Sequence, residues 1–173
     1  MNALRSLRAP FLALLCAAAC GGPPPSPQAP PPLGLVPAAS LLYDDDAGGL
    51  RDSLRLVVRA PAGLDSLWRR ATAGQPAPPP PPAVDFGREM VLAVAAGRMT
   101  PNDRIRVDSV GVRRLPGADG RMREVLAVLV RTVEACERYT AAAYPSQVVR
   151  LRRFDGPVVF VERRERAEGC ARE

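Results

Sequence analysis

The chain has 173 residues, of which 47% are hydrophobic and only 5% are aromatic, and its formal net charge is +6. It contains no histidine, which excludes Ser-His-Asp and Cys-His catalysis as well as zinc or haem sites with histidine ligands. Every basic residue is arginine, and GC-rich codon usage explains this more simply than phosphate binding does. Because nucleic-acid binding needs basic clusters interleaved with aromatic residues, we expect no nucleic-acid partner.

The first twenty residues have the layout of a secretory signal. Arg5 and Arg8 precede a short apolar run at 11–19, and small residues lead up to Cys20. The run is too short for a transmembrane helix, which needs roughly 20 apolar residues. We therefore predict a signal peptide over residues 1–19, and removing its two arginines lowers the net charge from +6 to +4.

Cys20 is the predicted lipid-attachment site. A cut next to a cysteine resembles that of bacterial lipoproteins, in which the thiol is acylated, commonly with palmitate, and becomes residue one of the mature chain. By resemblance to sorted lipoproteins, Gly21 in place of aspartate favours the outer membrane of the cell envelope. The alternative is ordinary cleavage that leaves Cys20 as a plain periplasmic thiol, because Ala17 stands where lipoprotein signals usually have leucine.

Residues 20–39 form a proline-rich tether between the predicted anchor and a domain that we expect over 40–173. Proline tracts favour extended polyproline II structure, which keeps a domain away from a bilayer. A proline-motif ligand for a partner's groove is the alternative. A second proline tract, 76–82, lies inside the domain and predicts a surface insertion.

The first part of the domain predicts a strand followed by a helix. Asp44–Asp46 precede two glycines and predict a solvated turn, because a calcium loop needs spaced ligands and a closing glutamate. Residues 54–60 read as a strand. After Pro61, apolar residues recur at helical spacing up to Ala71, which predicts a short amphipathic helix that presses Trp68 onto a sheet.

The second part of the domain predicts strands and tight turns. Residues 90–96 are apolar at every position, as expected for a central strand, whereas 104–108 alternate arginine with apolar residues, as expected for a strand with one wet face. A turn at 115–120 leads to a strand at 124–133. The remaining expected elements are strands at 148–153 and 158–161, joined by a turn at 155–157 into a closing hairpin.

The fold class follows from these connections. Most links are too short for crossovers, so the sheet should be mainly antiparallel. We predict an α+β domain with about six strands, arranged as a sandwich or a barrel, and one short helix.

Cys136 and Cys170 are the thiols that remain besides Cys20 once the signal is removed. In an oxidising compartment two such cysteines most simply pair. A disulfide between them would close a loop of 34 residues, which gives a stabilisation of roughly 4 kcal/mol in the chain-entropy model. Two unpaired thiols are the alternative, because sequence does not show that the Cα atoms approach each other.

The order of elements resembles a known family. The segment at 84–94 carries Asp85-Phe86 and runs into the apolar strand, and the segments at 144–149 and 157–160 follow. Over about 54–161 the chain resembles the C-terminal domain of the PrcB family, named for a lipoprotein subunit of a spirochaete surface protease complex. Relatives often have a Thr-Gly-Gly-Tyr-like turn where this chain has Thr-Pro-Asn-Asp-Arg at 100–104.

The resemblance implies a non-catalytic role, with no cofactor, in assembling or stabilising a partner such as a surface protease. We therefore expect an envelope lipoprotein that binds another protein and is not an enzyme. One alternative is a small-ligand module that uses the interior of a barrel-like sheet. Another is a hydrolase that uses Asp85 and Glu89, although Asp85 as an acceptor for backbone N–H groups in the preceding turn and Phe86 as a core plug account for that segment.

Overall fold

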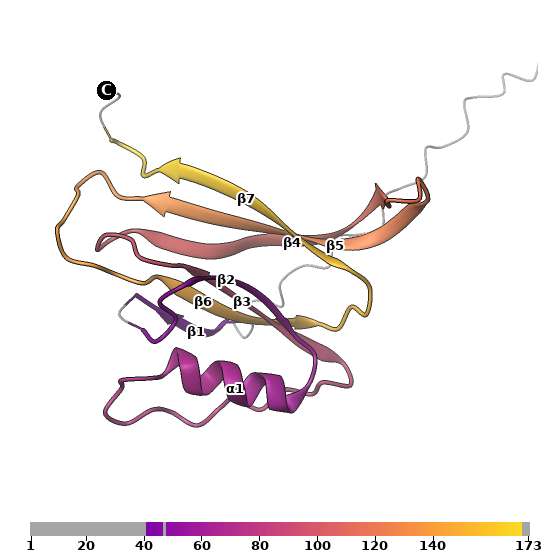
Figure 1. Ribbon diagram of the computed structural model, residues 1–173, viewed down its shortest axis with the longest axis horizontal. Coiled ribbons are helices and arrows are strands. Elements are labelled where there is room, and N and C mark those ends of the chain that lie inside the picture. Colours follow the sequence, from indigo (N-terminus) through magenta and orange to yellow (C-terminus); the bar gives the residue numbers. More distant parts are fainter. Residues whose placement is uncertain (1–40, 47, 171–173) are drawn as a thin grey trace, which may run out of the picture.

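The computed structural model describes residues 41–46 and 48–170, which form two β-sheets and one helix (Figure 1). The predicted signal peptide, Cys20 and the tether lie outside the described residues. The elements in chain order are β1 (Leu41–Asp45), β2 (Ser53–Val58), α1 (Pro61–Ala71), β3 (Glu89–Ala96), β4 (Arg104–Pro116), β5 (Met122–Glu134), β6 (Ser146–Arg152) and β7 (Val158–Arg166).

The elements form three layers. One sheet has the order β1-β6-β3-β2 and is antiparallel throughout, and the other has the order β4-β5-β7. Helix α1 lies on one side of the four-stranded sheet and the three-stranded sheet lies on the other (Figure 1). The α+β class with mainly antiparallel strands is confirmed, and because neither sheet is closed the barrel alternative is wrong.

Strand β3 occupies the centre of the molecule. Its consecutive residues Met90 to Ala95 are 0% exposed, on both faces of the sheet. Leu92 and its alternate neighbours pack between the sheets, whereas Ala93 and its alternate neighbours pack under α1. The predicted central strand is therefore confirmed, and its lack of any polar position follows from having both faces covered.

Helix α1 begins at Pro61, and proline suits this position because the first N–H groups of a helix have no intrahelical partner. The helix buries the predicted apolar face. Trp68 is 5% exposed, and its ring meets the Tyr43 ring edge-on at 5.6 Å between centroids. Its Nε1–H donates to the carbonyl oxygen of Pro79 at 2.8 Å. The proline-rich loop after the helix thus closes over Trp68 and satisfies the one polar group of the buried ring.

Residues Asp44 and Asp45 lie in strand β1, so the predicted turn at Asp44–Asp46 is wrong for two of its three residues. Aspartate is depleted in β-strands. Here, however, β1 pairs with β6, and this pairing places Asp45 opposite Ser146. The Asp45 carboxylate also lies 2.7 Å from the Tyr43 hydroxyl. Long-range pairing and this hydrogen bond outweigh the local preference for a turn.

The predicted closing hairpin is also wrong, because β6 and β7 belong to different sheets. Strand β6 lies between β1 and β3, so both of its edges are occupied, and β7 instead pairs in parallel with β5. The short connection crosses from one sheet to the other. Arg59 holds it by donating to the carbonyl oxygens of Phe154 at 3.1 Å and Gly156 at 2.9 Å.

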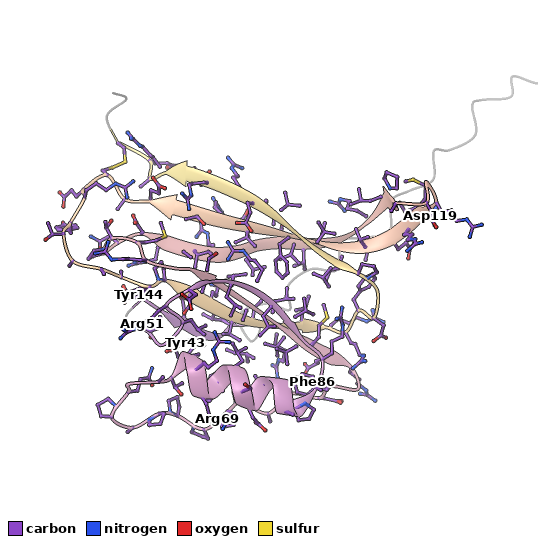
Figure 2. All side chains as sticks on the ribbon, viewed as in Figure 1. Tyr43, Arg51, Arg69, Phe86, Asp119 and Tyr144 are labelled. Carbon is purple, nitrogen blue, oxygen red and sulfur yellow. A yellow bond between two sulfur atoms is a disulfide. The ribbon has the colours of Figure 1, made fainter. Side chains whose placement is uncertain are left out.

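The β4-β5 hairpin is longer than predicted and extends past the sandwich (Figure 1). The two strands pair from Arg104 and Val133 to Pro116 and Met122, and a turn at 117–120 closes the hairpin. Figure 2 places Asp119 at this tip, away from the rest of the molecule. Among the described residues, no helix is both long and apolar enough to cross a membrane.

Replacement of Leu92 by alanine tests the central position of β3. Leu92→Ala should lower the free energy of unfolding by about 2–5 kcal/mol, because it leaves a cavity between two packed sheets. The measurement is urea denaturation of the domain. Met122→Ala is the control, since Met122 is 61% exposed and its loss should change stability by less than about 0.5 kcal/mol. Equal effects of the two variants would contradict the three-layer packing.

Candidate protein-binding surface

The face of the β4-β5-β7 sheet that is turned away from the four-stranded sheet, here called the outer face, carries no other described element (Figure 1). Leu126, Val128 and Val130 of β5 point into the core between the sheets. Strand alternation therefore turns the residues between them outward. Helix α1 and the packing of the two sheets against each other cover three of the four sheet faces and leave this one open.

An apolar patch occupies the centre of the outer face. Val159 and Val161 of β7 lie opposite Ala127 and Leu129 of β5, and the two valines are 38% and 47% exposed. We define the outer-face patch as Ala127, Leu129, Val159 and Val161, of which the two β5 residues are half-buried. Cross-strand apolar pairs are ordinary inside a core, and apolar side chains gathered on an exposed sheet face are a feature of surfaces that bind other molecules.

Three arginines stand side by side at the end of the patch near the termini of β5 and β7. Arg106 lies opposite Arg131, and Arg131 lies opposite Arg163 in the next strand. Like charges directly opposite each other destabilise a sheet. A surface pocket of about 450 Å³ lies at this end.

Two carboxylates offset part of this repulsion. Arg131 donates to Asp108 and, at 3.2 Å, to Glu165. Arg106 lies 3.8 Å from Asp108, and Arg163 lies 2.9 Å from Glu165. The hydrogen bond to Asp108, followed by that to Glu165, raises the pKa of Arg131 above its ordinary value. Three cations and two anions thus form one network, which leaves one excess positive charge.

A β-bulge supplies the geometry of this network. The register of β4 against β5 shifts between Val107 and Ser109, so Asp108 is an extra residue beside Arg106. Bulges re-aim side chains in this way. The backbone N–H of Val107 donates to the Gln147 side chain of β6 at 2.8 Å, which fixes the bulge against the other sheet.

The network lies next to the disulfide. Cys136 and Cys170 are bonded, with Cα atoms 5.1 Å apart, so the predicted bridge is confirmed and the unpaired alternative is wrong. The bridge joins the chain after β5 to the chain after β7. The Ala167 N–H donates to the Glu134 carbonyl at 2.8 Å between the same segments.

Asp103 fixes the adjoining turn. Its side chain is 0% exposed and accepts hydrogen bonds from the Thr100 N–H at 2.9 Å, the Thr100 hydroxyl at 3.0 Å and the Ala135 N–H at 2.8 Å. A buried carboxylate is tolerated where it is hydrogen-bonded in this way. The turn at 100–104, which departs from the PrcB pattern, is therefore locked to the end of β5 beside Cys136.

The inner side of β7 is held by a cross-sheet ion pair. Arg55 of β2 donates through two nitrogens to both carboxylate oxygens of Glu162, at 2.7 and 2.8 Å. The same guanidinium donates to the carbonyl oxygens of Leu54 and Ala95. The hydrogen bonds from Arg55 lower the pKa of Glu162 below its ordinary value of 4.5.

The carboxylates proposed for a hydrolase serve the local structure. Asp85 accepts the Gly87 N–H at 3.0 Å, in the turn that follows it and not in the preceding one as expected. Glu89 accepts the Asp85 N–H at 3.1 Å and pairs with Arg150 at 3.4 Å. Phe86 packs partly buried against the helix-side core, as expected. No group of three metal-ligating side chains occurs among the described residues.

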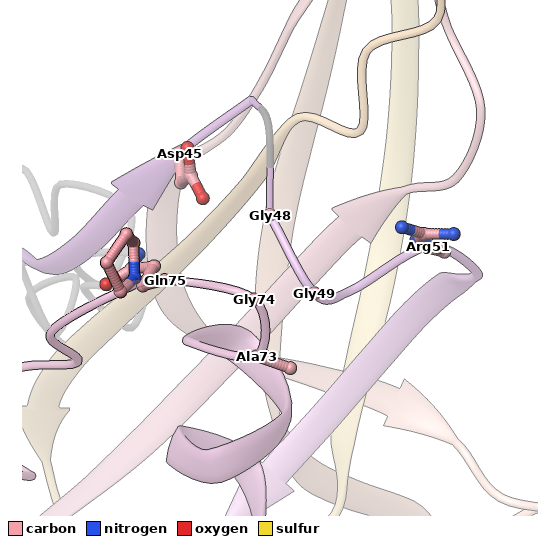
Figure 3. Close-up of a pocket in the computed structure, with 8 residues that line it drawn as sticks. Asp45, Gly48, Gly49, Arg51, Ala73, Gly74 and Gln75 are labelled. Atoms are coloured by element: carbon pink, nitrogen blue, oxygen red, sulfur yellow. The ribbon is translucent and has the colours of Figure 1, made fainter.

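A polar pocket of about 630 Å³ lies where β1 ends and α1 stops (Figure 3). Asp45, Arg51 and Gln75 supply its side-chain polar groups. Beside it, the Tyr43 hydroxyl lies 2.9 Å from the Ala71 carbonyl and accepts from Gln75 at 3.0 Å, and burial raises its pKa. The space between the sheets, which the small-ligand alternative would use, is filled by core side chains.

The arginine network was not predicted from the sequence. The alternating arginines at 104–107 indicated only a strand with one solvent-exposed face. The missing information was that β7 pairs with β5, which brings Glu165 and Arg163 beside Arg131.

Comparison of the chain with protein-family models, curated proteins and solved structures finds no match in any of the three. The resemblance to the PrcB family stays a prediction.

Removal of the disulfide should weaken the attachment of β7. The double variant Cys136→Ser, Cys170→Ser should lose roughly 2–4 kcal/mol of unfolding free energy, because the bridge closes a loop of 34 residues in the unfolded chain. Urea denaturation measures the loss. The wild-type domain in reductant is the matched control and should lose the same amount, and an unchanged midpoint in both would contradict the role given to the bridge.

The ion pair of Glu162 predicts a pH-dependent contribution to stability. Since folding lowers the pKa of Glu162, the pair stabilises the domain above pH 4.5 and loses its effect as the pH falls through the folded-state pKa. Glu162→Gln should cost less than about 1 kcal/mol at pH 7, because Glu162 is half exposed. The difference in unfolding free energy between Glu162→Gln and the wild type should disappear in acid. Glu168→Gln should differ from the wild type at neither pH.

Proposed function

We propose that the protein is a membrane-anchored lipoprotein of the bacterial cell envelope whose domain binds or stabilises another protein without catalysis. The observation that carries this proposal is the outer face, where Val159 and Val161 of β7 are exposed beside the half-buried Ala127 and Leu129 of β5. Contiguous exposed apolar surface rimmed by charge is typical of protein interaction sites. The ion-pair network at one end of the patch supplies part of this charged rim.

The envelope location rests on the N-terminal sequence. Arg5, Arg8, the apolar run and Cys20 have the order of a lipoprotein signal. The disulfide between Cys136 and Cys170 supports export, because such bonds persist in oxidising compartments. The outer membrane as destination, and a surface protease as partner, rest on the resemblances to sorted lipoproteins and to the PrcB family.

The non-catalytic role is supported by the way the candidate acids are used. Asp85 accepts a backbone N–H in the turn before β3, and Glu89, the first residue of β3, pairs with Arg150. A general acid or base needs a carboxyl group that is free to exchange a proton with substrate. Their positions serve to start the central strand.

Binding of a small polar ligand is the second candidate function, and the pocket beside Tyr43 is the observation that favours it. The pocket is lined by one carboxylate, one guanidinium and one amide, from Asp45, Arg51 and Gln75, of which Asp45 and Gln75 also hydrogen-bond Tyr43 and Arg51 lies over the Tyr144 ring. A panel of amino acids and other small zwitterions, screened by thermal shift on the domain, tests this function. A ligand-induced rise in melting temperature that Arg51→Ala abolishes would support it, and no rise would remove it.

Purification from gently solubilised membranes tests the protein-binding function. The tagged full chain, expressed in its native host, should bring down one stoichiometric partner that remains in the complex through gel filtration. The matched control is Val161→Asp, which places a charge in the middle of the outer-face patch and should release that partner. Recovery of the monomer alone from the wild-type strain would contradict the proposal.

The Cys20→Ala variant tests the anchor. Loss of the acylated thiol should move the protein from the membrane fraction to the soluble fraction of lysed cells, because a lipid chain provides the attachment. Immunoblotting of the fractions measures the shift. Cys16→Ala is the control, since that residue lies within the predicted signal peptide, and it should leave the protein in membranes. Membrane retention of Cys20→Ala would count against lipidation.

A further inference from the structure

We propose that the outer face binds an acidic segment of a partner protein, in which apolar side chains are flanked at both ends by carboxylates. This inference rests on the proposed protein-binding function and adds the chemistry of the partner. Three features of the outer face favour such a partner: its apolar centre, the positive charge at each end, and the distance between the ends.

The end of the patch near the hairpin tip carries one positive charge more than its acids neutralise. Arg113 lies opposite Val125, and Arg123 lies two residues from Val125 along β5. Asp119 pairs with Arg123 at 2.7 Å. Arg113 donates only to the Val112 carbonyl among the described residues and has no carboxylate partner there. Arg113 is therefore available to an incoming carboxylate.

The opposite end of the patch, around Arg131, also carries one positive charge more than its acids neutralise. Asp108 and Glu165 are shared among Arg106, Arg131 and Arg163. Arg106 and Arg163 are about half and three fifths exposed, whereas Arg131 is held between the two acids and is about one quarter exposed. The outer two arginines can thus turn toward a partner, while the central one keeps the acids in place. Planar guanidinium groups suit bidentate recognition of carboxylates.

The spacing of the two ends defines the length of the partner segment. Arg113 lies opposite Val125 and Arg163 lies opposite Arg131, so the two available arginines are six positions apart in register, which is about 20 Å along a strand. A partner segment that reaches both ends has acidic residues about six positions apart if it is extended. If it is helical, the acidic residues are about 13 positions apart. Apolar residues between them would contact the valines of β7.

Charge also argues against a second copy of this chain as the occupant. In a two-fold dimer the same face meets itself. Either relative orientation of the strands then places an end with excess arginine against another such end. Like charges brought together in an interface cost free energy and suppress that pairing. An acidic partner has the complementary pattern and gains from both ends at once.

Site-specific photocrosslinking of the full chain in its native host tests the inference. A photoreactive amino acid at Val161 should crosslink one partner, and mass spectrometry of the joined peptide should show apolar residues flanked by aspartate or glutamate at one of the two spacings. The same amino acid at Asp65, on the solvent side of α1, is the matched control and should not crosslink that peptide.

Charge reversal supplies the second arm. Arg113→Glu combined with Arg163→Glu should reduce the crosslinking yield at position 161 about tenfold, because both ends then repel the acidic segment. Arg69→Glu on α1 (Figure 2) changes one exposed arginine elsewhere and should leave the yield unchanged. Melting temperatures of the purified variants show that they fold, and Arg113→Ala combined with Arg163→Ala should give a smaller loss in the same direction.

Several outcomes would overturn the inference. Crosslinks at position 161 to a second copy of the chain, to lipid, or to a segment without acidic residues would each do so, as would an unchanged yield after charge reversal. Absence of any crosslink together with a purified stoichiometric complex would refute the outer face as the site and leave the protein-binding function intact. Absence of both the crosslink and the complex would refute both proposals.

Discussion

The burial of β3 on both faces is the constraint on which the other layers depend. Six consecutive residues of this strand have no exposure to solvent, and an apolar strand of this kind needs a cover on each side. Helix α1 covers one face with its leucines and an alanine, and the β4-β5-β7 sheet covers the other with valines and leucines. The covering sheet has two faces of its own, so one of them is left exposed.

The parallel attachment of β7 decides the character of that exposed face. Three contacts hold the strand: the ion pair from Arg55 on its inner side, the disulfide at its end and the hydrogen-bond ladder to β5. In this register Val159 and Val161 extend an apolar strip, and Arg163 joins the network around Arg131. The bulge at Asp108 completes the network from β4. The chemistry of the outer face therefore follows from long-range pairing.

Local patterns in the sequence were sufficient to predict α1, β3 and the alternating part of β4. In each segment the spacing of the apolar residues fits one kind of element. They were insufficient where pairing is non-local. Asp44 and Asp45 look like a turn until β6 lies beside them, and the short link before Val158 looks like a hairpin although it crosses between sheets. The disulfide was predictable by elimination, whereas the arginine network required the register of three strands.

The central claim is that another protein covers the outer face in the envelope. Thiol labelling measures this coverage directly, with a cysteine placed at Val161 and, as a reference, at Asp65 on α1. We expect maleimide to react with position 161 much more slowly in the gently solubilised native complex than in the isolated domain, and with position 65 at the same rate in both. Equal rates at position 161 in complex and isolated domain would contradict it.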